Sequence, residues 1–169
     1  MKTELVEYKL IDWVLFNIDL IKQLLKEMKY TGAAVVYSDS PGLEVVIDKM
    51  ERIIVFVDDA LKVVETIEKA IEKICEDDDL FDIFTEVYFE QRKLADIPIV
   101  LREKHQKQIS ERTVKTKKRQ IQNIVKKYLS DEDIEIEFIA SLMSALKINP
   151  KVQRHHKKVQ KSFAKIALL

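Results

Sequence analysis

Apolar residues recur every three or four positions along most of this chain, which is the spacing of one face of an α-helix. The spacing predicts a first helix over residues 3–30, apolar on nearly all sides in its middle and ended by Thr31-Gly32. A second long helix is predicted over residues 43–76, where a nearly heptad stripe favours a helical hairpin or a coiled-coil seam. Residues 53–57 have strand propensity. The helical spacing continues on both sides of them, so we expect helix there as well.

Shorter helices are predicted in the second half of the chain from their end signals. Residues 77–79, three aspartates, end the second helix and cap the next one. Pro98 suits a first helical turn, Ser110 can cap a following helix, and Ser130 with Asp133 resembles a capping box. The predicted helices cover residues 80–94, 98–106, 110–129, 130–147 and 151–167.

The composition agrees with an all-α fold. Hydrophobic residues make up 47% of the 169 residues and charged residues 34%, a mixture that supports a packed core. Two glycines and three prolines are too few for the turns of a β-sandwich or for a glycine-rich phosphate loop. The single cysteine, Cys75, excludes a disulfide framework and a cysteine-based zinc motif, favours a reducing cytoplasm and is most simply a small buried residue.

No segment of the sequence has the pattern of a signal peptide or a membrane span. The most apolar stretch, residues 10–25, is interrupted by Asp12, Asp19 and Lys22. We therefore expect a cytoplasmic protein that does not enter membranes. Its expected organisation is a helical hairpin for oligomerisation or polymerase contact over residues 1–94, a helix-turn-helix over 95–129 and a C-terminal helical extension over 130–169.

The charge is balanced in sum but divided along the chain. Lys plus Arg and Asp plus Glu both total 29. Residues 1–101 carry 12 basic and 22 acidic side chains, a net charge of −10. Residues 102–128 carry 10 basic and 2 acidic side chains, a net charge of +8. Such an excess indicates an electrostatic partner, most often nucleic acid.

The order of elements in residues 97–129 is typical of a helix-turn-helix: a short helix, a polar turn and a long basic helix. A helix capped by Ser110 presents backbone N–H groups and the positive end of its dipole to a phosphate. Val114, Ile121, Val125 and Tyr128 are predicted to form its buried stripe. Arginine can bind guanine through two hydrogen bonds, and threonine can contact a thymine methyl group or a phosphate. The candidate DNA-binding residues are Ser110, Arg112, Thr113, Lys115, Thr116 and Arg119.

This stretch resembles the recognition helix of sigma-70 region 4-like regulators, through Ser-Glu-Arg-Thr-Val-Lys at residues 110–115. The chain as a whole is similar to the RinA/ArpU-type transcription regulators of phages over about residues 1–129. The similarity rests on the Ser/Pro/Gly loop at 38–42, the Asp-Lys-x-Glu run at 48–51 and the aromatic pair at 88–89. It implies a sequence-specific DNA-binding activator of phage or prophage genes, with late genes as the expected targets.

The chain also departs from that family's pattern at the helix-turn-helix. Lys104 stands where the first helix usually has a small residue, and Gln108 stands where the turn usually has glycine. Lys107 replaces the apolar residue that usually precedes this glycine. Two geometries would account for these residues: a turn that is longer than usual, or a displaced first helix.

A second basic face is predicted on the C-terminal helix. It can dock on the body with its basic side in water, contact DNA, or lie on a membrane surface; the first reading is the simplest. The residues of this face recur at steps of three and four after Lys147: Lys151, Arg154, Lys158, Lys161 and Lys165.

The sequence offers no catalytic residues. The adjacent histidines at 155–156 point in different directions on a helix, and residues 77–79 lack the glycine and distal glutamate of a calcium loop. We therefore expect no enzyme, no metal and no cofactor. The expected partners are double-stranded DNA, host RNA polymerase and a second copy of the chain. The alternatives are a helical adaptor, or a phage antagonist of a host protein, that does not bind DNA, and more remotely a nuclease.

Overall fold

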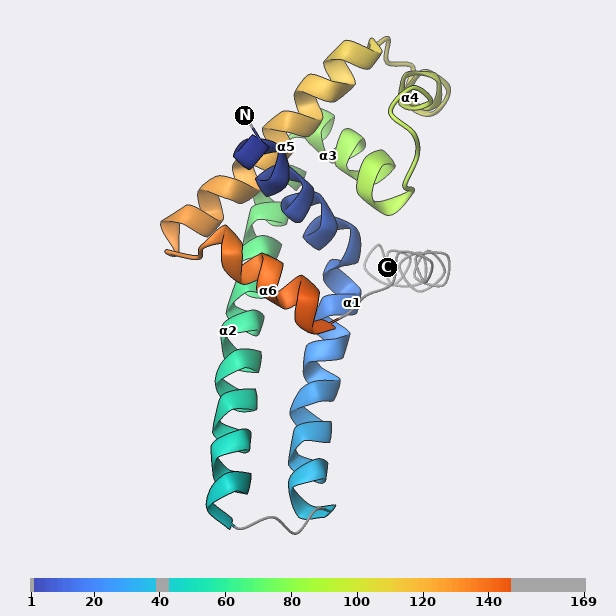
Figure 1. Cartoon of the computed structure of the whole chain (residues 1–169). Coiled ribbons are helices and arrows are strands. Elements are labelled where there is room, and N and C mark those ends of the chain that lie inside the picture. Colours follow the sequence, from blue (N-terminus) through green and yellow to red (C-terminus); the bar gives the residue numbers. More distant parts are fainter. Residues whose placement is uncertain (1, 39–42, 147–169) are drawn as a thin grey trace.

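The computed structural model describes residues 2–38 and 43–146, and every regular secondary-structure element in these ranges is a helix (Figure 1). The predicted all-α fold is therefore confirmed, including a helical conformation for residues 53–57. The predicted last helix, with its basic face, lies outside the described residues. The elements are α1 (Lys2–Ser38), α2 (Leu43–Cys75), α3 (Asp78–Phe84), the π-helical turn η1 (Thr85–Phe89), α4 (Ile97–His105), α5 (Glu111–Asp131) and α6 (Ile136–Leu146).

The long helices α1 and α2 form the predicted hairpin and lie side by side along most of their length (Figure 1). At the end of the hairpin nearest the amino terminus, α3 and α5 pack on α2, and α6 crosses α1. One continuous core joins these helices through side chains that are completely buried, among them Ile11, Ile67, Ile121 and Ile139. Burial of this apolar surface, at about 25 cal/mol per Å², provides the main driving force for folding.

The first helix is longer than predicted, because it continues through Thr31-Gly32 and ends at Ser38. A single glycine inside a helix costs about 1 kcal/mol relative to alanine, which a helix of this length tolerates when good helix formers follow. Ala33 and Ala34 are such residues. At the other end of the hairpin, Cys75 is exposed, so the expectation that it is buried was wrong.

The third predicted helix is shorter and less regular than expected. Asp77 caps it as predicted, because its carboxylate accepts hydrogen bonds from the backbone N–H groups of Asp79 and Leu80. The helix then widens into η1 and ends at Phe89, not at residue 94, and the backbone of Gln91 is left-handed (φ 51°). Three consecutive residues of this wider turn, 86–88, are buried.

The predicted capping box at Ser130 and Asp133 was wrong. Ser130 lies inside α5, and Asp133 adopts a left-handed conformation (φ 54°) just after it. The N–H groups of Asp133 and Ile134 donate to the carbonyl oxygens of Ser130 and Leu129 at 3.1 and 2.9 Å. This is the hydrogen-bond pattern of a Schellman motif, which ends a helix. Asp133 therefore terminates α5, and α6 begins only at Ile136.

Candidate nucleic-acid interface

The helices α4 and α5 are joined by five residues, 106–110, where a helix-turn-helix commonly has three or four. Gln106 ends α4 in a left-handed conformation (φ 56°). Ser110 then caps α5 as predicted: its backbone is extended and its hydroxyl oxygen accepts from the N–H group of Thr113 at 3.2 Å. The departure from the family pattern is thus accompanied by a longer connection between the two helices.

Two lysines that depart from the family pattern attach α4 and the connection to the preceding elements. Lys104 Nζ lies 3.0 Å from Glu86 Oε1, and Arg92 Nε lies 2.6 Å from Glu86 Oε2. The Glu86 side chain is only 3% exposed, so these two cations neutralise a buried carboxylate. Lys104 therefore has a structural role within the fold.

Lys107 makes a second attachment, because its ammonium group lies 2.8 Å from both Asp79 Oδ1 and Asp82 Oδ2. The hydrogen bonds that Lys107 donates to Asp79 and Asp82 raise the pKa of Lys107. The same contact holds the pKa of the Asp79 carboxyl below its usual value. Lys107 is thereby engaged with α3 and points away from the exposed side of α5.

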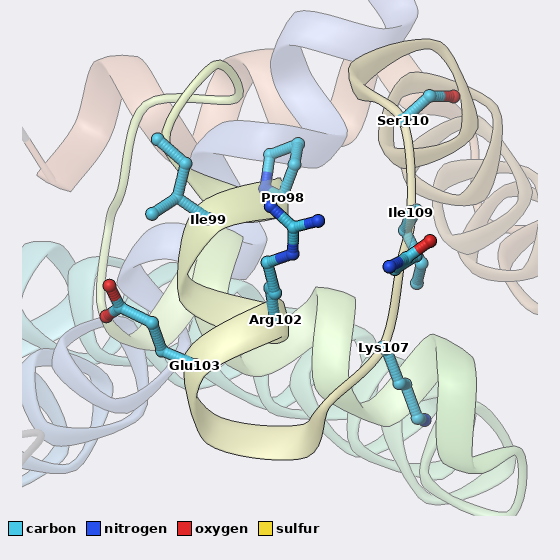
Figure 2. Close-up of a pocket in the computed structure, with 8 residues that line it drawn as sticks. Pro98, Ile99, Arg102, Glu103, Lys107, Ile109 and Ser110 are labelled. Carbon is cyan, nitrogen blue, oxygen red and sulfur yellow. The ribbon is translucent and has the colours of Figure 1, made fainter.

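An open groove of about 510 Å³ lies between α4 and the connection that leads into α5 (Figure 2). In this view Pro98 and Arg102 on α4 face the segment that carries Ile109 and Ser110. Ile99 and Glu103 also line the groove and point to the left of α4 in the figure. Arg102 is exposed and makes no ion pair with the described residues. The groove thus brings an arginine near the cap of α5.

The two sides of α5 differ as predicted. Val114, Ile121 and Val125 are completely buried, and only Tyr128 of the predicted stripe is half-buried. Leu129 and Gln122 complete the buried side. The candidate DNA-binding residues are all in the exposed class: Ser110, Arg112, Thr113, Lys115, Thr116 and Arg119.

The exposed candidate residues differ in whether their side chains already have a partner within the chain. The Arg112 guanidinium has no partner among the described side chains. Lys115 lies 3.4 Å from Glu111 one turn earlier, in a pair whose members are both about half exposed or more. Such a pair contributes about 0–1 kcal/mol and is readily exchanged for another anion. The Thr116 hydroxyl donates to the Arg112 carbonyl oxygen at 3.0 Å.

Arg119 and the second half of α5 lie against the first turns of α1, which the sequence did not indicate. The guanidinium of Arg119 stacks on the ring of Tyr8, 3.7 Å from its centre, and the Tyr8 hydroxyl donates to Asn123 Oδ1 at 2.7 Å. Lys126 lies 2.8 Å from Glu7, which raises its pKa. Arg119 is exposed as predicted but is engaged with α1, whereas Arg112 in the first turn has no partner among the described side chains.

Asp12 connects this contact with the interior. One of its carboxylate oxygens accepts from Tyr88 Oη at 2.6 Å and from Gln122 Nε2 at 2.8 Å. The other oxygen lies 3.3 Å from Lys118. Burial, the nearby Asp12 charge and the hydrogen bond between them raise the pKa of Tyr88, so the phenol stays protonated and donates. Asp12 therefore fixes α5 to α1 and η1 at one point.

Ion pairs with the rest of the chain neutralise part of the positive charge of residues 102–128. Four of the ten cations in this segment pair with acidic side chains outside it: Lys104, Lys107, Lys118 and Lys126. The cations that remain without such a partner in the described structure include Arg102, Arg112 and Lys115. Lys117, Arg119 and Lys127 also lack an acidic partner among the described residues, so the unpaired cations extend along α5, with more of them in its first half than in its second.

Sequence reasoning missed Arg102, which precedes the turn, and Tyr8, which is 115 residues away from Asn123. Arg102 follows Pro98 by four residues, and this spacing could have indicated that both lie on the same face of α4. Nothing in the local sequence pattern indicated the contact of Tyr8 with α5.

Comparisons with protein-family models, with curated proteins and with solved structures give no match to this chain. None of the helices in the described ranges has the length and apolar character needed to cross a membrane.

Proposed function

We propose that this chain binds double-stranded DNA in a sequence-specific manner and regulates transcription. The observation that carries the proposal is the two-sided character of the first turns of α5. Arg112, without a partner among the described side chains, lies on the exposed side of a capped helix. On the opposite side Val114 and Ile121 are completely buried. An arginine on such a helix suits a guanine edge in the major groove, and neighbouring threonines suit methyl groups or phosphates.

Two neighbouring elements carry groups that would bind phosphates in the same docking. The positive end of the α5 dipole and the N–H groups of its first turn favour an anion. Arg102 on α4 lines the groove beside Ser110, where the next phosphate along a DNA strand would be attracted. In this arrangement Arg112 reads a base, and Arg102 with Lys115 positions the backbone.

The biological setting is proposed from the resemblance to RinA/ArpU-type regulators. It suggests activation of phage or prophage late genes in the cytoplasm, with host RNA polymerase as a further partner. A homodimer formed through α1 and α2 would place two recognition helices on paired half-sites. No cofactor or catalytic step is part of this proposal.

A helical adaptor that does not bind DNA is the second candidate. The observation in its favour is the pairing of four cations with acidic side chains of the same chain, which reduces the free charge of residues 102–128. Its remaining basic surface would then contact an acidic protein.

A gel-retardation assay against fragments of the source genome, with and without Mg²⁺, tests these readings. The proposal expects specific retardation of a few fragments, independent of the metal ion. Absence of retardation favours the adaptor, and metal-dependent degradation favours a nuclease. Arg112→Ala should shift the specific band to higher protein concentration, because the loss of one base contact costs about 1–3 kcal/mol. The matched control is Lys69→Ala, since Lys69 is 61% exposed in an ion pair on α2.

A further inference from the structure

The basic side of α5 extends beyond the cations that have no partner. Arg112, Arg119 and Lys126 are spaced by seven residues, so they lie close to one line along the helix. From the first to the last this line measures about 21 Å, at 1.5 Å per residue. Its second half is covered by α1: Tyr8 stacks under Arg119, and Glu7 pairs with Lys126. Tyr8 and Glu7 thus contact cations that lie on the same line of α5 as the unpaired Arg112.

We infer that Glu7 and Tyr8 form an acidic cover that competes with DNA for the second half of α5. The inference rests on the proposed function and deepens it. With the cover in place, DNA contacts only the first turns of α5. With the cover displaced, Arg119 and Lys126 join the same interface and lengthen it. The cover therefore changes both the affinity for DNA and the length of the DNA contact along α5.

The exposure of these groups suits such an exchange. The Glu7 side chain is 24% exposed and that of Lys126 is 42% exposed, so a phosphate can approach the lysine while the pair is formed. The neighbouring Leu5 and Val6 are 57% and 55% exposed, so the apolar contact of the first two turns of α1 with the core is made chiefly through Tyr8, which is partly buried. Exchanging a carboxylate for a phosphate at a half-exposed lysine involves small net energies.

Asp12 limits how far the cover can move. Its carboxylate is bonded to Tyr88 and Gln122, which are almost completely buried, and Ile11 beside it is also buried. The displaced part is consequently the first two turns of α1, before residue 10. Lys118 stays with Asp12 and remains outside the DNA interface.

The test uses Glu7→Gln in the full chain and measures fluorescence anisotropy of a labelled duplex over a range of KCl concentrations. Removing the competing carboxylate should tighten binding at low salt about two- to fivefold. It should also steepen the slope of log affinity against log salt by about 0.9, because Lys126 then gains a phosphate. The matched control is Glu65→Gln, which removes the same charge from an exposed ion pair on α2.

Two further variants separate the cover from a general charge effect. Glu7→Gln combined with Lys126→Gln should return the slope to that of the parent, since the freed cation is gone. Tyr8→Leu should release Arg119 and steepen the slope in the same direction as Glu7→Gln. Thermal unfolding of each variant confirms that it is folded.

The outcomes separate the inference from the proposed function. The parent protein could bind DNA while Glu7→Gln and Glu65→Gln change its affinity and salt dependence equally. This result overturns the cover and leaves the proposed function standing. If the Glu7→Gln variant binds DNA and the parent protein does not, both the cover and the proposed function are supported. Failure of every variant to bind at low salt overturns both, because no cation of α5 then contacts DNA.

Discussion

Replacing Glu86 by glutamine tests how the fold holds α4 beside the recognition helix. The substitution keeps the size of the side chain and removes the negative charge that Arg92 and Lys104 share at 2.6 and 3.0 Å. Hydrogen bonds to charged groups contribute about 1.5–3 kcal/mol each, and breaking a buried pair costs about 3–5 kcal/mol. Because Arg92 and Lys104 are 37% and 47% exposed, water stabilises them after the change. The expected loss in the free energy of unfolding is therefore about 2 kcal/mol, at the lower end of these ranges.

Thermal and urea unfolding followed by far-ultraviolet circular dichroism measure this loss. For a chain of this size, about 2 kcal/mol lowers the Tm by roughly 4–8 °C. Glu65→Gln on α2 serves as the control and should change the Tm by much less, since its ion pair is exposed. A double-mutant cycle with Lys104→Met isolates the pair. A loss below about 0.5 kcal/mol, or no coupling in the cycle, would refute the reasoning. The buried Ile97 and Leu101 would then suffice to hold α4.

Further predictions concern the cap, the titration of charged groups and the assembly. Ser110→Ala should lower the free energy of unfolding by about 1 kcal/mol in urea titrations, and Ser110→Asp should retain it. Burial raises the pKa of Asp19, so its charge opposes folding at neutral pH. Asp19→Asn should therefore raise the Tm at pH 7, and this gain should shrink as the pH falls below the folded pKa and vanish below the unfolded pKa of 3.8. The Lys107–Asp79 contact should stabilise the fold fully only between the unfolded pKa values of 3.8 and 10.5. Below this window Asp79 becomes protonated, and above it Lys107 loses its proton at its raised pKa, so the Tm difference between parent and Lys107→Met should shrink on both sides. Light scattering at tens of micromolar should reveal a dimer if association reaches about −7 kcal/mol, and a monomer would argue against the half-site arrangement.

The helical spacing predicted the fold class and the two faces of α5 because both depend on local periodicity. Val114 and Ile121 are buried, Arg112 is exposed, and Ser110 caps the helix, all as the pattern indicated. A cap needs only neighbouring residues, so it is visible in sequence. The boundaries that failed depend on less common backbone states. Asp133 ends a helix in a left-handed conformation that a capping-box pattern conceals.

The contacts that shape the candidate site were beyond local patterns. Glu86 is buried because a π-helical turn places three consecutive residues inside, and no simple periodicity predicts such a turn. The pairing of Glu7 with Lys126 and the stacking of Tyr8 on Arg119 join segments more than 100 residues apart. A count of charges along the chain therefore overstated the free basic surface of residues 102–128.

The most direct test of the central claim compares Arg112→Ala with the parent on two duplexes, a retarded genomic fragment and a scrambled version of it. If Arg112 reads a base, the substitution should weaken binding to the selected duplex by about 1–3 kcal/mol and change binding to the scrambled duplex far less. Lys115→Ala should weaken both about equally, as a phosphate contact does. If folded Arg112→Ala and Lys115→Ala bind both duplexes as the parent does, the first turns of α5 are not the DNA-reading element.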